Sequence, residues 1–188
     1  MVGAHCHTPL PCLKHPLFLE KWYEAMRPKF IVDVNVGRLA TWLRIMGYDA
    51  AFPRSASDNE LVRLALKQDR LLITRDAGFR LRRSVRLGQL RMLYVVADDL
   101  RGQLRQLIRE LHLRVDNGFS RCLRCNEPLA PVDKAAVSDQ IPDYVARTQT
   151  VFSQCSSCRR VYWPGTHWSN MISELARANQ EAKAIKEE

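Results

Sequence analysis

Two Cys-x-x-Cys motifs constrain this chain more than any other feature of its sequence. Cys122 pairs with Cys125 and Cys155 with Cys158, and 29 residues separate the two pairs. A two-residue spacing lets both thiolates of a pair reach one metal ion, at about 2.3 Å for Zn²⁺. Paired disulfides and redox-active Cys-x-x-Cys motifs are the alternatives. Four thiolates fill the coordination sphere of Zn²⁺, so the pattern favours a structural zinc ribbon, which we place at residues 117–170.

The segment before the ribbon, residues 29–116, alternates between strand-like and helix-like patterns. Short apolar runs are typical of buried strands, and the stretches between them repeat apolar residues at helical spacing. The expected strands are Phe30–Val32, Asp49–Phe52, Arg70–Thr74 and Met92–Val96, and the expected helices are Asn35–Met46, one that Ser57 or Asp58 caps, Gly78–Leu87 and Leu100–Leu111. Alternation of this kind predicts an α/β domain with a largely parallel sheet.

Acidic side chains stand at three of the expected element ends. Asp33 and Asp76 follow strands, and Asp58 stands at a helix start. Because the carboxyl ends of parallel strands meet at one edge of a sheet, we expect the three carboxylates to meet there. Such a set suits Mg²⁺ or Mn²⁺, which activates water and stabilises developing charge in phosphodiester hydrolysis. Each aspartate alone is more typical of a helix cap or a turn, so the hypothesis depends on their joint placement.

The balance of charge indicates which class of partner the chain could bind. The chain has 29 Lys and Arg against 20 Asp and Glu, and most of the excess lies in residues 29–116. A basic domain favours a polyanionic partner such as a nucleic acid, because neutralised phosphates release their counterions. The alternative is an arginine-rich composition that serves no binding partner.

Several of these basic residues flank the expected acidic site. Asn35, Arg38 and Arg75 are candidates for binding substrate, the guanidiniums by holding phosphate and the amide by orienting a carboxylate or water. Arg82 and Arg83 belong to an arginine run that could follow a nucleic-acid backbone. Surface arginines, a helix-capping asparagine and a solvated basic helix face are the alternatives.

The two ends of the chain have a different composition. Residues 1–28 are expected to form a flexible N-terminal extension, and the roles of Cys6 and Cys12 within it stay open. Residues 171–188 are expected to form a charged helical tail. No apolar run reaches the roughly 20 residues that a membrane helix needs, and no secretory signal pattern opens the sequence. We therefore expect an intracellular, cytoplasmic protein with no membrane contact.

Aromatic residues gather near the end of the expected ribbon. Tyr162, Trp163, His167 and Trp168 could stack on unpaired bases, as aromatic side chains do in RNA-binding modules. The alternative is that they cover the thin core of a small ribbon. His167 is not expected to bind the zinc, because four thiolates already complete the shell.

Beyond these patterns, ordered blocks of sequence resemble a known family. The blocks are Phe30–Asp49, Ser57–Leu61, Leu71–Asp76, Phe119–Asn126, Pro131–Lys134 and Cys158–Trp168. Over residues 29–171 they resemble the Mut-seven C-terminal RNase domain family. The resemblance implies a compact PIN-like nuclease domain at residues 29–116 that carries a zinc ribbon. It also implies a metal-dependent ribonuclease that hydrolyses RNA phosphodiester bonds at a carboxylate-bound Mg or Mn site.

The resemblance also assigns roles to individual residues. Asp33 matches the acid at the end of the first PIN strand, Asp58 the acid that opens the central helix, and Asp76 the acid after a Thr-Arg motif. Larger PIN nucleases supply a further acid, for which Glu60 or Asp49 are the candidates here. An incomplete acidic set would instead make the chain a non-catalytic RNA- or ribosome-binding module. The oligomeric state stays open.

Overall fold

The computed structural model describes residues 27–114 and 119–184, and its first unit is a four-stranded sheet. The strands are β1 (Lys29–Val32), β2 (Ala50–Ala51), β3 (Arg70–Thr74) and β4 (Met92–Tyr94). Their order is β2-β1-β3-β4, and every neighbouring pair is parallel, which confirms the predicted fold class. The chain passes from β1 to one side for β2 and then crosses to the other side for β3. The strand order therefore reverses between β1 and β3, where open α/β sheets bind ligands.

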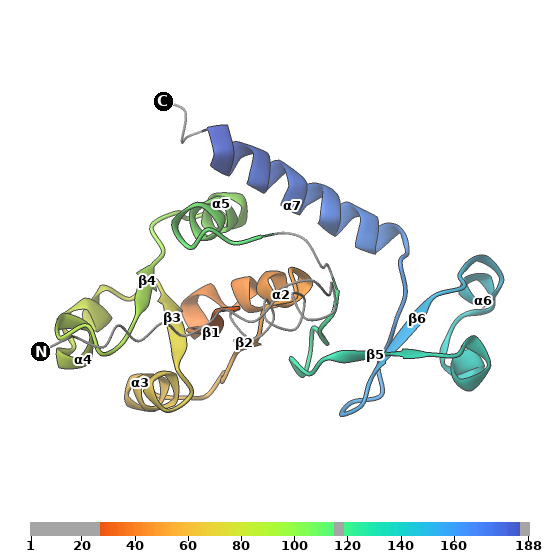
Figure 1. The fold of residues 1–188 in the computed structure, drawn as a ribbon, viewed down its shortest axis with the longest axis horizontal. Helices are drawn as coiled ribbons and strands as arrows, with labels where there is room; N and C mark the ends of the chain where they lie inside the picture. Colours follow the sequence, from red (N-terminus) through yellow and green to blue (C-terminus); the bar gives the residue numbers. More distant parts are fainter. Residues whose placement is uncertain (1–26, 115–118, 185–188) are drawn as a thin grey trace, which may run out of the picture.

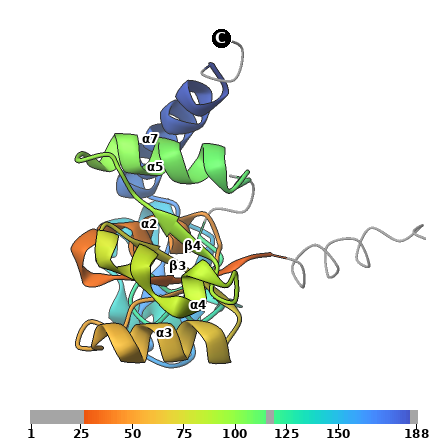
Figure 2. The ribbon, with the colours of Figure 1, turned by 90° about the vertical axis from the view of Figure 1, so that its left-hand side faces the viewer.

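Helices cover both faces of this sheet because the strand side chains alternate between two apolar clusters. Phe30 and Val32 point to one face and Ile31 to the other. The first face carries α2 (Arg38–Ile45) and α5 (Leu100–Glu110), and α7 (Thr166–Ala184) packs on α5. The second face carries α3 (Asp58–Lys67), the 3-10 helix η2 (Ala77–Leu81) and α4 (Arg83–Arg86). Figure 2 shows α5 and α7 above the sheet and α3 below it.

Local sequence explains where these helices begin. Ser57, one of the two residues expected to cap this helix, is the N-cap of α3, and its side chain and that of Glu60 form the reciprocal bonds of a capping box. The helix expected over Gly78–Leu87 is instead divided into η2 and α4. Arg82 interrupts it with an extended backbone (φ −62°, ψ 135°), and its guanidinium bonds to Asn59 and Asp58 at the start of α3. Tertiary contacts therefore override the helical pattern at this point.

The second unit contains the cysteines and lies beside the sheet domain (Figure 1). It is a three-stranded antiparallel sheet in the order β5-β6-β7. Its elements are β5 (Leu129–Val132), the 3-10 helix η3 (Lys134–Gln140), α6 (Asp143–Thr148), β6 (Phe152–Cys155) and β7 (Val161–Tyr162). Val137, Ile141, Val145 and Phe152 form a small apolar cluster of its own. We call this unit, with its cysteine turns, the ribbon.

The last helix returns from the ribbon to the first unit. The helical tail expected at residues 171–188 is, in its described part, the larger portion of α7, and the expected boundary at residue 170 falls inside this helix. Leu175 and Ala178 are fully buried in the main core, and Glu174 accepts hydrogen bonds from Arg101 on α5. Most of the expected N-terminal extension, including Cys6 and Cys12, lies outside the described residues. Of the helices in the described part of the chain, none has the length and apolar character needed to cross a bilayer.

Candidate catalytic site and zinc centre

Two of the three predicted acids lie together at the carboxyl ends of β1 and β3. Asp33 follows β1, and its amide donates to the carbonyl of Ile73 at 2.9 Å. The hydroxyl of Thr74, the last residue of β3, donates to Oδ2 of Asp33 at 2.6 Å and accepts from the amide of Asp76 at 2.9 Å. Thr74 is fully buried and Asp33 is only 5% exposed. Thr74 therefore joins the two acid-bearing loops across the point where the strand order reverses.

Both aspartates also cap short helices. Oδ1 of Asp33 accepts from the amide of Val34 at 2.6 Å, at the start of the 3-10 helix η1 (Val34–Val36). Oδ1 of Asp76 accepts from the amide of Gly78 at 2.7 Å, at the start of η2. Capping was the alternative interpretation of these residues, and the structure shows it for both. A carboxylate oxygen has a second lone pair, so a cap does not prevent it from binding a cation.

The third predicted acid is engaged elsewhere on the same edge. Asp58 opens α3, and its carboxylate pairs with Nη2 of Arg82 at 3.1 Å. Among the described residues, only the four cysteines form a group of three or more His, Cys, Asp or Glu whose ligand atoms lie within 4.8 Å of one another. At that spacing Asp33, Asp58 and Asp76 do not form a common set. Glu60 is nearby in sequence, and its Oε2 accepts from the amide and hydroxyl of Ser57 at 2.8 and 2.9 Å.

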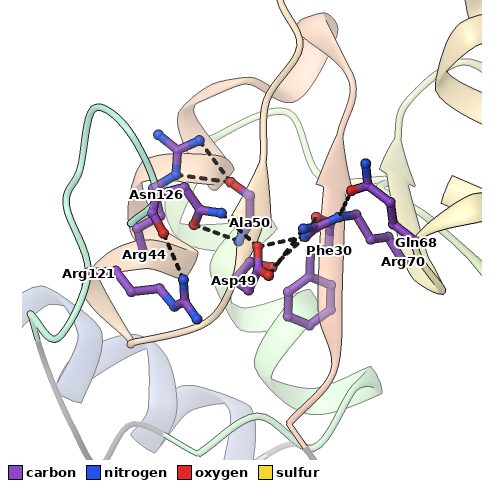
Figure 3. Close-up of polar contacts among 8 residues, drawn as sticks. All are labelled: Phe30, Arg44, Asp49, Ala50, Gln68, Arg70, Arg121 and Asn126. Carbon is purple, nitrogen blue, oxygen red and sulfur yellow. Dashed lines mark hydrogen bonds and ion pairs between the residues drawn. The ribbon is translucent and has the colours of Figure 1, made fainter. Parts of the chain in front are cut away.

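Asp49 lies at the opposite, amino end of the strands, which corrects its candidacy as an additional acid (Figure 3). Nη1 and Nη2 of Arg70 donate to its two oxygens at 2.6 and 3.1 Å, and Nδ2 of Asn126 donates to Oδ1 at 2.6 Å. Burial raises the pKa of Asp49, but the hydrogen bonds from Arg70 and Asn126 outweigh it, so the net shift is downward. Asp49 is a structural anion and cannot reach the edge where β1 ends.

The predicted substrate-binding residues, which lie in η1, on α2 and after β3, line one cleft. The cleft has a volume of about 670 Å³, and Asn35, Arg38 and Arg75 are on its wall. Oδ1 of Asn35 accepts from the amide of Arg75 at 3.2 Å, which ties the loop after β1 to the loop after β3. The guanidinium of Arg75 pairs with Asp98.

Sequence reasoning missed three further arginines of this cleft. They are Arg44, Arg54 and Arg124. We call the hollow lined by these arginines together with Asn35, Arg38 and Arg75 the basic cleft. Arg54 follows β2 at the carboxyl edge of the sheet, which the strand pattern could have indicated. No local signal places Arg124, because it belongs to a cysteine turn 80 residues along the chain from Arg44. Arg82 and Arg83 are not part of the cleft wall and belong to the η2–α4 segment.

The two cysteine motifs fold into matching turns, which we call the first and second knuckle. The amides of Cys122 and Cys155 donate to carbonyls five residues further on, at 2.8 and 3.0 Å. The residues after the second cysteines, Asn126 and Arg159, have positive φ of 70° and 60°. Their amides donate back to the carbonyls of Cys122 and Cys155, both at 2.9 Å. The repeated geometry directs the two pairs of thiols toward one point.

The chemistry of this point fits zinc. All four cysteines are free thiols, with their sulfurs within 4.8 Å of one another. The sulfurs of Cys122 and Cys158 are 3.6 Å apart, against about 2.05 Å in a disulfide. Burial raises the pKa of the Cys122 thiol, but hydrogen bonds from the Tyr162 hydroxyl and from backbone amides lower it to about 6, whereas the hydrogen bond with Cys158 and burial raise the pKa of Cys125 to about 12. The four thiolates would hold a structural Zn²⁺.

The first knuckle is fixed to the sheet domain by a buried arginine. Nη1 of Arg44, on α2, donates to the carbonyls of Leu123 and Arg124 at 2.7 and 3.2 Å. Nε and Nη2 of the same side chain donate to the carbonyl of Ala50 at 3.0 and 2.8 Å, and the amide of Ala50 donates to Oδ1 of Asn126 at 2.9 Å. Figure 3 shows Arg44, Ala50 and Asn126 side by side. This contact brings the ribbon to the rim of the basic cleft.

The comparisons with known proteins agree with the sequence resemblance. No curated protein and no solved structure matches this chain. The family model described as Mut7-C RNAse domain matches residues 28–175, which covers most of the sheet domain, the ribbon and the first half of α7. This chain therefore belongs to the Mut7-C RNAse domain family.

Proposed function

We propose that this chain is a metal-dependent ribonuclease in which Asp33 and Asp76 hold Mg²⁺ or Mn²⁺. One observation carries the proposal: Thr74 joins the two carboxylate-bearing loops at the point where the strand order of the sheet reverses. Active sites of open parallel sheets form at such points. The basic cleft begins with the residues that directly follow Asp33, so a negatively charged substrate would be drawn to the same edge.

The donor set suits a hard divalent cation. Mg²⁺ is commonly bound by one or two carboxylates and keeps several water ligands, so Asp33 and Asp76 are a sufficient protein contribution. A cation bound there would supply an activated water and charge stabilisation at the scissile phosphate. Thr74 orients the Asp33 carboxylate, and Arg38 and Arg75 would neutralise the phosphate. Asp58 would join the set once its carboxylate exchanges Arg82 for the cation.

The experiment is cleavage of a panel of structured and unstructured RNAs with Mg²⁺, with Mn²⁺ and without added metal. Metal dependence is tested by omission, because a chelator would also remove zinc from the cysteines. We expect Asp33→Asn and Asp76→Asn to abolish cleavage while RNA affinity stays equal or rises, since one repulsive charge is lost. Asp69→Asn is the matched control, because this exposed aspartate precedes β3 at the opposite end of the sheet. Wild-type activity in Asp33→Asn would exclude the catalytic role.

A second candidate is a non-catalytic RNA-binding module. The observation that favours it is the pairing of Asp58 with Arg82, which leaves the three carboxylates without a common 4.8 Å set. Titration with Mn²⁺ separates the two candidates, since the paramagnetic ion broadens NMR signals only near its binding site. Broadening around Asp33 and Asp76 supports the ribonuclease. Its absence at millimolar Mn²⁺, together with retained RNA binding, supports the module.

A further inference from the structure

An aromatic pocket lies where the ribbon meets the start of α7. Its volume is about 490 Å³. Its characteristic lining residues are Phe119, Tyr162, Trp163, His167, Trp168 and Met171. We call this hollow the aromatic pocket. Neither the zinc centre nor the proposed catalytic site uses it, so its concentration of ring side chains needs a separate explanation.

The two indoles in the pocket are held in place by neighbouring groups. Trp168 packs against Phe119 with ring centres 5.7 Å apart, and Trp163 packs against Phe152 at 6.5 Å. A methyl group at Gly165 would lie 3.1 Å from Nε1 of Trp163, so the glycine permits close approach of that ring to the backbone. Both indoles are only half-buried. Rings that are positioned and still partly exposed are suited to stacking on a flat ligand.

The aromatic pocket and the basic cleft share a wall. Leu123, in the first knuckle, lines both hollows, and the next residue, Arg124, lines the basic cleft. Arg44 fixes the carbonyls of both residues, so this wall has a defined position. A polyanion with its phosphates in the basic cleft therefore has an aromatic surface available just across the knuckle. Single-stranded nucleic acid has this combination of backbone charge and flat, apolar bases.

We propose that an unpaired RNA strand crosses the first knuckle, with phosphates in the basic cleft and one unstacked base in the aromatic pocket. The inference rests on the proposed function, because it takes RNA as the partner. Arg54 and Arg124 contact the backbone, and Trp168 and Trp163 stack on the base. A zinc ion held by the four cysteines would then have a role beyond folding, because the first knuckle forms the wall that separates the phosphate path from the base.

The test measures affinity for a fluorescein-labelled single-stranded RNA without added Mg²⁺ or Mn²⁺. We expect Trp168→Leu, which keeps apolar volume, to weaken binding about 5- to 100-fold, the range found for loss of one stacked base. Trp168→Phe keeps a ring and is expected to retain most of the affinity. Tyr144→Leu is the matched control, because this tyrosine is an exposed aromatic on α6 of the same ribbon and is not part of the pocket wall.

An RNA of equal length with abasic sites separates stacking from charge. Abasic RNA should bind wild type and Trp168→Leu equally, whereas Arg54→Gln should weaken binding of intact and abasic RNA alike. If a folded Trp168→Leu variant binds intact RNA as tightly as wild type, the proposal that the aromatic pocket holds a base is wrong. Equal binding of intact and abasic RNA by wild type would also contradict this proposal and would indicate another occupant. Both results leave RNA binding in place, whereas failure of wild type to bind any RNA removes the proposed function as well.

Discussion

The zinc centre and the acidic edge of the sheet are built in opposite ways. In the zinc centre, each half is a local turn whose own hydrogen bonds direct two thiols, and all four sulfurs lie within 4.8 Å. At the acidic edge, Asp33, Asp58 and Asp76 come from three elements, and only Thr74 links two of them. The knuckles place all four ligand atoms around one point. At the acidic edge, the carboxylate of Asp33 is buried, whereas that of Asp58 forms an ion pair with Arg82.

The difference indicates how each site would respond to its metal. Without an ion the four thiols stay largely protonated and nothing links the two knuckles, so the ribbon is expected to depend on the ion for its stability. The acids are satisfied by caps and by an ion pair, so the sheet domain should fold without a divalent cation. Metal removal should therefore affect stability at one site and activity at the other.

Loss of zinc should unfold the ribbon. Structural zinc contributes on the order of 10 kcal/mol to the folding of small zinc domains, and its removal leaves the two knuckles without a link between their thiols. We expect Cys155→Ser, or removal of zinc by a chelator, to raise hydrogen exchange throughout residues 119–165 while most of the sheet domain stays protected. Mass spectrometry of peptic fragments measures this. Exchange at Ala50 should also rise, because its partner Asn126 belongs to the first knuckle.

Ser156→Ala is the control for this experiment, since it changes a residue between the ligands of the second knuckle without removing a thiol. Its exchange pattern should match that of wild type. An unchanged pattern in a chain shown to have lost its zinc would contradict the interpretation of the four cysteines. Uniform unfolding of both units would instead show that the knuckle supports the sheet domain as much as itself.

Arg44→Met should give the next largest effect. Arg44 is 6% exposed and donates to the carbonyls of Ala50, Leu123 and Arg124. Its removal leaves buried acceptors without a partner, and we expect a loss of about 3 kcal/mol in the free energy of unfolding, measured with urea. Arg38→Met, an exposed change on the same helix, should stay within about 0.5 kcal/mol. A loss as small as that of the control would mean that water replaces the guanidinium.

The sequence predicted elements and ligands that depend on nearby residues. The four strands, the parallel sheet and a helix start capped at Ser57 or Asp58 follow from local patterns, and the structure confirms them, with Ser57 as the cap. The cysteine spacing likewise indicated the thiol cluster. The broken helix at Arg82 could not be predicted, because Asn59 and Asp58, which bond to its side chain, lie in another element.

The same limit applies to the candidate site. Spacing alone placed Asp33 and Asp76 on one edge, since parallel strands carry the residues after them to the same side. It could not show that Asp49 binds Arg70 at the other end, because that pairing joins a turn to a strand 21 residues away. Nor could it show that Arg124 enters the basic cleft, which depends on how α2 docks on the first knuckle. Contacts between elements distant in the sequence, rather than patterns within each element, decided these cases.

The smallest predicted effect concerns Asp49, the acid that the sheet uses for structure. Hydrogen bonds from Arg70 and Asn126 hold its pKa below the ordinary value of 3.8 in spite of burial. Its stabilising effect is therefore full above the pKa of the unfolded chain and is lost as the pH falls through the lower folded pKa. We expect Asp49→Asn to lose about 2 kcal/mol of unfolding free energy at pH 7, and urea titrations should show this deficit shrinking as the pH falls below about 4. Asp69→Asn, at an exposed ion pair, should change the free energy of unfolding at pH 7 by less than about 0.5 kcal/mol. A deficit that stays constant with pH would mean that Asp49 acts through its shape and not its charge.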